Sequence, residues 1–152
     1  FLYTVIFFAA GCNSPLTHEE LLLLSGEWNG RSSDYSKPPK ADSLFPTVSI
    51  TIFNDGSVKG KAGDAILEKC YIQRSRGAIA RALGLETDYI IEGFLTGKIT
   101  QSDSAGTAER DIVIPCNIYG DTLRGTLFVE EAWTYPLPVL PKFTVVKQPA
   151  LH

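Results

Sequence analysis

Three cysteines carry the chemistry that is easiest to specify in this chain: Cys12, Cys70 and Cys116. Cys70 and Cys116 alternate with isoleucines, so each falls on the apolar face of a candidate strand. Outside the cytoplasm these two residues could form a disulfide. Otherwise they are small buried thiols that pack as hydrophobic groups. The sequence leaves both alternatives open, because a disulfide depends on the separation of two Cβ atoms in space.

A second group with definite chemistry is a set of arginines between two candidate strands, formed by Arg74, Arg76 and Arg81. Guanidinium groups bind phosphate and carboxylate oxygens in a fork geometry, so the set is a candidate anion-binding site for lipid headgroups or phosphate. The alternative is a solvated turn whose charge Glu86 and Asp88 partly neutralise. Of these two interpretations, we favour the solvated turn.

A third candidate is the proline-rich segment 133–141, which reads WTYPLPVLP. Its three prolines restrict the backbone and stiffen the segment. Trp133, Tyr135 and Leu137 could form a lid or a surface for a protein partner. Alternatively, they fold back and cover one end of the domain, which we slightly favour.

Enzyme templates are missing from the sequence. It contains no G-x-S-x-G, C-x-x-C, P-loop or H-E-x-x-H motif, and its two histidines are His18 and His152. We therefore expect no catalytic residues, no metal site and no cofactor. The formal net charge of −3, with both signs mixed along the chain, also argues against nucleic acid as a partner.

Residues 1–10, FLYTVIFFAA, are uncharged and almost wholly apolar. This run is shorter than the roughly 20 residues that cross a bilayer, but it suits the apolar region of a signal peptide. The chain has no Met, so we expect a signal peptide over 1–11 that lacks its start.

The run Ala9-Ala10-Gly11-Cys12 resembles the lipobox of bacterial lipoproteins, although Leu is commoner at the place of Ala9. The resemblance implies cleavage before Cys12 and a diacylglycerol on its thiol, with 12–17 as a short tether and 18–152 as a single β domain. It implies a membrane partner reached through the lipid anchor. The expected location is the bacterial cell envelope, at the outer membrane or its periplasmic face, because Asn13 is not the Asp that retains some lipoproteins in the inner membrane. The alternatives to a lipoprotein leader are a buried N-terminal strand or a plain secretory signal.

The elements that position these residues begin with a short helix. Thr17 and Glu20 have the spacing of a capping box, and four leucines, 21–24, follow. We expect the helix to plug one end of the domain, with its leucines buried from several sides. Strand patterns bounded by turn residues then recur, over 26–33, 47–53, 57–62, 65–73, 88–100, 110–119, 122–130 and 142–148.

Eight mostly antiparallel strands in a meander predict an all-β fold, either a closed barrel or a two-sheet sandwich. Gly26-Glu27-Trp28 and Thr87-Asp88-Tyr89 resemble the G-x-W and T-D-Y motifs of lipocalins. That resemblance implies a barrel with Trp28 packed across its closed end. Lipocalins place an Arg over this Trp from the last strand, where this chain has only Lys142 and Lys147. The stretch 57–99 also resembles small uncharacterised bacterial envelope proteins.

Two functions therefore stand nearly equal. The first is a lipid-anchored, non-enzymatic protein that binds a small apolar ligand or lipid inside the barrel, and its inward faces should be apolar throughout. The second is a structural or interaction lipoprotein with a filled core, acting through the proline-rich segment. An inhibitor or a hydrolase is a third, less favoured possibility.

Overall fold

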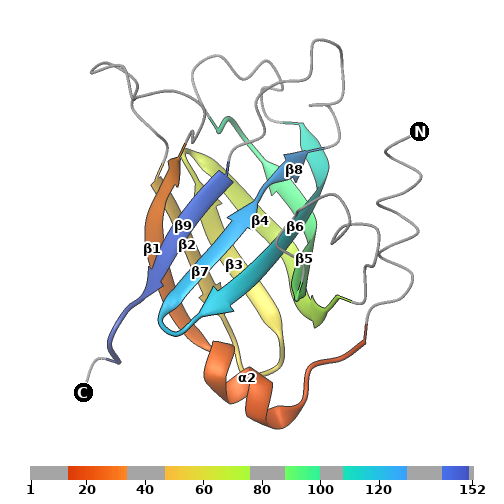
Figure 1. Cartoon of the computed structure of the whole chain (residues 1–152). Coiled ribbons are helices and arrows are strands. Elements are labelled where there is room, and N and C mark those ends of the chain that lie inside the picture. The colour runs from red at the N-terminus through yellow and green to blue at the C-terminus, as the bar shows by residue number, and fades with distance from the viewer. Residues whose placement is uncertain (1–13, 34–46, 76–87, 100–107, 130–141, 151–152) are drawn as a thin grey trace.

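The computed structural model describes residues 14–33, 47–75, 88–99, 108–129 and 142–150. Their fold is an antiparallel β-barrel with one short helix across an end (Figure 1). The strands are β1 (Gly26–Ser33), β2 (Thr47–Ile52), β3 (Ser57–Ala62), β4 (Ala65–Arg74), β5 (Tyr89–Thr96), β6 (Glu109–Tyr119), β7 (Thr122–Thr126), β8 (Phe128–Val129) and β9 (Lys142–Lys147).

Strands β1 to β7 pair in chain order, each antiparallel to the next. β9 closes the ring because it pairs with both β7 and β1, and the short β8 pairs with β6. β8 continues β7, because Cys116 pairs with Gly125 and Val113 with Phe128 in one unbroken register. The result is a closed barrel of eight strands, which confirms the all-β prediction and decides for the barrel against the sandwich.

The break between β7 and β8 has a local cause in the neighbouring strand. Pro115 of β6 lies between the two paired stretches, and a proline cannot donate a ladder hydrogen bond. The structure places an interruption of the β6–β7/β8 ladder at this residue. β5 is also shorter than expected, ending at Thr96.

The barrel core follows from alternation along the strands. In β2 the inward residues Val48, Ile50 and Ile52 are buried, while Thr47 and Ser49 are exposed. The largest fully buried side chains include Trp28, Leu24, Ile91, Leu95, Ile112, Ile114 and Leu123. Because these residues come from strands all around the ring, the interior is packed with side chains.

The helix α2 (His18–Leu24) lies across one end of the barrel, which we call the closed end (Figure 1). The end where β1 stops and β2 starts is called the far end. The capping box is confirmed: Glu20 N donates to Thr17 Oγ1 at 3.2 Å, and Thr17 N donates to Glu20 Oε2 at 2.9 Å.

The expected burial of all four leucines in α2 was wrong. Leu24 is fully buried, whereas Leu22 and Leu23 are 56% and 60% exposed. The physical reason is that a two-turn helix lying flat across a barrel turns only one face toward the core. The other face carries two large apolar side chains into solvent.

Candidate functional site

The chain enters the described structure at the closed end. Ser14 N donates to Arg74 O at 3.1 Å, and Arg74 N donates to Ser14 O at 3.0 Å. This pair of bonds forms an isolated antiparallel bridge to the last residue of β4. Cys12, the predicted lipidation site, lies outside the described residues, two positions before this attachment.

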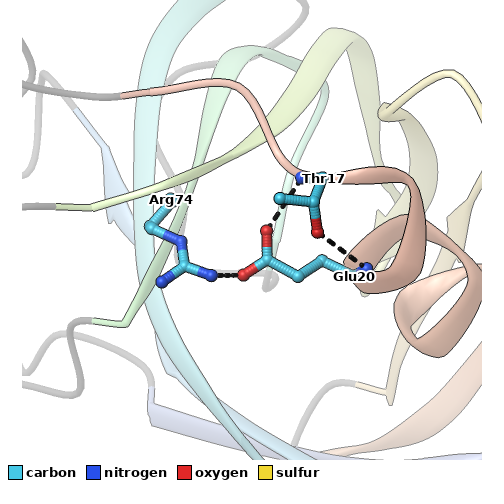
Figure 2. A network of polar contacts seen from close by, with 3 residues as sticks. All are labelled: Thr17, Glu20 and Arg74. Carbon is cyan, nitrogen blue, oxygen red and sulfur yellow. Dashed lines mark hydrogen bonds and ion pairs between the residues drawn. The ribbon is translucent and has the colours of Figure 1, made fainter.

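Arg74 also contacts the helix through its side chain. Its Nη2 forms an ion pair with Glu20 Oε1, while the other carboxylate oxygen of Glu20 accepts the hydrogen bond from Thr17 (Figure 2). Glu20 therefore caps α2 and joins it to β4. Among the predicted anion-binding arginines, Arg74 has this carboxylate partner, and Arg76 and Arg81 lie outside the described residues.

Trp28 closes the core beneath α2. It is fully buried, and its Nε1 donates to Leu24 O at 2.9 Å. Lys147 Nζ lies 5.5 Å from the centre of the Trp28 ring and donates to Leu23 O at 2.8 Å. In residue type, this lysine departs from the lipocalin pattern. In the structure it occupies the place over the Trp that the pattern gives to an Arg on the last strand.

Gly26 is required in this arrangement for two reasons. Its φ of +132° lies in a region that L side chains rarely adopt, and a Cβ there would stand 3.0 Å from Lys147 Cε. The T-D-Y-like motif also reaches this end of the barrel, because its Tyr89 begins β5 and packs against the core. These features are consistent with a lipocalin-like barrel.

Within the described residues, Cys70 and Cys116 are buried thiols that form no disulfide. Cys70 lies beside Gly93 of β5, since a Cβ on Gly93 would collide with the Sγ of Cys70. Cys116 pairs with Tyr89 of the same strand. Gly93 and Tyr89 are four residues apart along β5, which is roughly 13 Å at the rise of a strand. A disulfide needs Cα atoms within about 7 Å, so the bridge left open by the sequence does not fit this fold.

The barrel interior contains a small cavity toward the far end. Its volume is about 20 Å³, enough for one water molecule, which needs roughly 10–15 Å³. Apart from Ser32, its lining is apolar, and it includes Val48, Ala62, Leu67, Leu127 and Phe143.

The expectation of inward faces that are apolar throughout was wrong at this end of the barrel. Arg110, which alternates with Ile112 and Ile114 on β6, is only 5% exposed, and its Nη2 donates to Gly97 O at 2.7 Å. The sequence indicates this inward position, because Arg110 lies two residues before Ile112 and therefore on the same face of β6 as the inward isoleucines.

Two groups have pKa values that burial shifts. Desolvation raises the pKa of the half-buried Glu92 carboxyl above 4.5. It also raises the pKa of the Cys70 thiol, whose Sγ donates to the backbone oxygens of Glu68 and Phe94. Within the described ranges, no cluster of three His, Cys, Asp or Glu side chains could hold a metal ion.

Comparison with protein-family models, with curated proteins and with solved structures finds no match to this chain. In the described part of the chain, no helix is long and apolar enough to cross a membrane. The proposed lid or partner surface, Trp133, Tyr135 and Leu137, lies outside the described residues. The closed end is therefore the candidate functional site, since the N-terminal attachment, the helix cap and the Trp28–Lys147 pair meet there.

Proposed function

We propose that this protein is a lipid-anchored, non-enzymatic component of the bacterial cell envelope that acts through its outer surface. The anchor is the diacylglycerol that the lipobox-like run Ala9–Cys12 would place on Cys12. The filled barrel is the observation that carries the proposal, because it leaves the surface as the part of the domain available for interaction.

The volume of the cavity supports surface action over carriage of a ligand. Pockets for small molecules measure on the order of 300–1,000 Å³, whereas the cavity beside Ser32 and Phe143 has about 20 Å³. A lipid or pigment could not enter this space without displacing several core side chains. We therefore favour the interaction lipoprotein with a filled core over a carrier, that is, a protein that binds a small apolar ligand or lipid inside the barrel.

The carrier remains the second candidate function because the cavity is apolar and an eight-stranded barrel is compatible with an internal ligand. Native mass spectrometry of the protein purified without detergent separates the two candidates. The filled-core proposal expects the apo mass from several growth conditions. A discrete adduct that denaturation releases would contradict it and support the carrier.

The anchor has its own test. The full chain, with an initiating Met and two lysines placed before Phe1, is expressed in a Gram-negative host, and the mature protein is analysed by intact mass. We expect an N-terminal Cys12 that carries acyl chains. The matched control is Cys12→Ser, which should remain unprocessed and unacylated. Cleavage at another position, or a mature protein without acyl mass, would contradict the proposal.

A further inference from the structure

We infer that the closed end of the barrel rests on the bilayer and inserts the side chains of Leu22 and Leu23 into its interface, with Phe53 and Tyr119 beside them. These four residues are called the closed-end face. The inference rests on the proposed lipid anchor and extends it, because it assigns an orientation to the domain and a contact surface to the membrane.

The first observation is the number of large apolar side chains exposed at this end. Besides Leu22 and Leu23, Phe53 is 40% exposed in the turn between β2 and β3, and Tyr119 is 51% exposed at the end of β6. Figure 1 shows that α2 and both of these turns lie at the same end of the barrel. An apolar group of this kind on a surface is typical of an interaction site.

Contacts hold these elements together as one surface. Gly56 of the β2–β3 turn lies against α2, since a Cβ there would stand 3.7 Å from Leu21 Cδ2. On the other side, Lys147 links α2 to the β6–β7 turn, because its Nζ donates to Leu23 O and its backbone N donates to Asp121 O. The closed-end face is thus built on packed elements.

The charges around the closed-end face suit a lipid headgroup region. Lys59 Nζ lies 5.9 Å from the centre of the Phe53 ring, and Arg124 Cζ lies 5.4 Å from that of Tyr119. Long cationic side chains beside aromatic rings are typical of membrane interfaces, where the stem lies in apolar surroundings and the charge reaches water.

Acidic residues at the same end of the barrel indicate which kind of lipid is sufficient for the closed-end face to bind the bilayer. Asp55 accepts two hydrogen bonds from Ser57, one from the hydroxyl and one from the backbone N. Both bonds lower the pKa of the Asp55 carboxyl, the hydroxyl bond more than the backbone one, and keep it ionised. Glu19 on α2 is a further exposed carboxylate. With both signs present, apolar insertion rather than net charge must hold the face to the bilayer, so zwitterionic lipid is enough.

The attachment of the chain identifies the bilayer as the occupant of this face. Ser14 is hydrogen-bonded to Arg74 at the closed end, and Cys12 precedes it by two residues, which span at most about 7 Å. A lipid on Cys12 therefore brings the closed end to the membrane surface. The far end could reach the membrane only if the Ser14–Arg74 bridge opened.

The test uses the acylated full chain in phosphatidylcholine vesicles whose acyl chains carry bromine, a quencher of tryptophan fluorescence. Leu23→Trp places a reporter on the closed-end face. Ile66→Trp is the matched control, because Ile66 is 44% exposed near the far end of β4. After subtraction of the wild-type signal from Trp28 and Trp133, we expect quenching on the order of twofold greater for Leu23→Trp.

Equal quenching of the two reporters on vesicle-bound, acylated protein would overturn the inference and leave the proposed anchor intact. Absence of acyl mass together with failure to float with vesicles would show that the anchor itself is wrong, and the inference would fall with it. Leu22→Trp is the second reporter if Leu23→Trp loses the cooperative unfolding transition of the parent protein.

Discussion

Lys147 Nζ lies 5.5 Å from the centre of the Trp28 ring and donates a hydrogen bond to Leu23 O at 2.8 Å. One side chain from the last strand thus contacts both the first strand and the helix that covers the barrel. Trp28 Nε1 completes the arrangement by donating to the next carbonyl of the helix, Leu24 O. The start and the end of the described chain are joined at this point.

The first prediction concerns this lysine. Lys147→Met keeps the apolar stem and removes the ammonium group, so it loses a cation–π contact and a hydrogen bond. We expect the free energy of unfolding to fall by about 1–2 kcal/mol in urea denaturation. Lys61→Met, at an exposed position of β3, is the control and should stay within about 0.5 kcal/mol of the parent. Equal effects of the two changes would show that Lys147 has no special role.

The second prediction concerns the ion pair between Glu20 and Arg74. Because the Arg74 side chain is half-exposed, a double-mutant cycle with Glu20→Gln and Arg74→Met should give a coupling of less than about 1 kcal/mol. The coupling should shrink further in 1 M salt, where screening is strong. Thr17→Ala breaks the helix cap as well and should cost about 1 kcal/mol by itself. A large coupling that salt does not change would contradict this description.

The third prediction is a pH dependence at Glu92. Burial raises the pKa of this carboxyl above 4.5, so the folded state binds a proton more tightly than the unfolded state. Glu92 therefore lowers stability as the pH rises from 4.5 through the folded-state pKa, and has no such effect below that window. We expect Glu92→Gln to be more stable than the parent at pH 7 and nearly equal at pH 4. Parallel stability curves for the two proteins would exclude this effect.

The fourth prediction tests the packing of the barrel. Leu95 is fully buried on the inner face of β5, and Leu95→Trp adds volume where little space exists. We expect a loss of about 1–3 kcal/mol and a lower melting temperature. Ile66→Trp, on the outer surface, should leave the melting temperature nearly unchanged. An unchanged melting temperature for Leu95→Trp would argue for a larger cavity and hence for the carrier.

The fifth prediction concerns the two buried thiols. With Cys70 and Cys116 on β4 and β6, separated by β5, reductant should not alter the unfolding curve. Both thiols should react with an alkylating reagent only after denaturation, because they are buried and the pKa of Cys70 is raised. An intact mass two units below the reduced value would contradict this assignment.

The sequence by itself determined the local structure. Alternating apolar residues predicted the strands, turn residues such as Asn54-Asp55-Gly56 bounded them, and Thr17 with Glu20 predicted the helix cap. These predictions succeeded because they depend on residues within a few positions of one another. The lipid anchor at Cys12 and the segment 133–141 stay predictions, since neither lies in the described part of the chain.

Only the tertiary structure decided which distant residues meet. Closure of the ring brings Lys147 over Trp28 and separates Cys70 from Cys116, while the flat placement of α2 exposes Leu22 and Leu23. Strand pairing and helix docking join positions more than a hundred residues apart, and such contacts leave no periodic pattern in the chain. Their geometry depends on how the whole barrel closes.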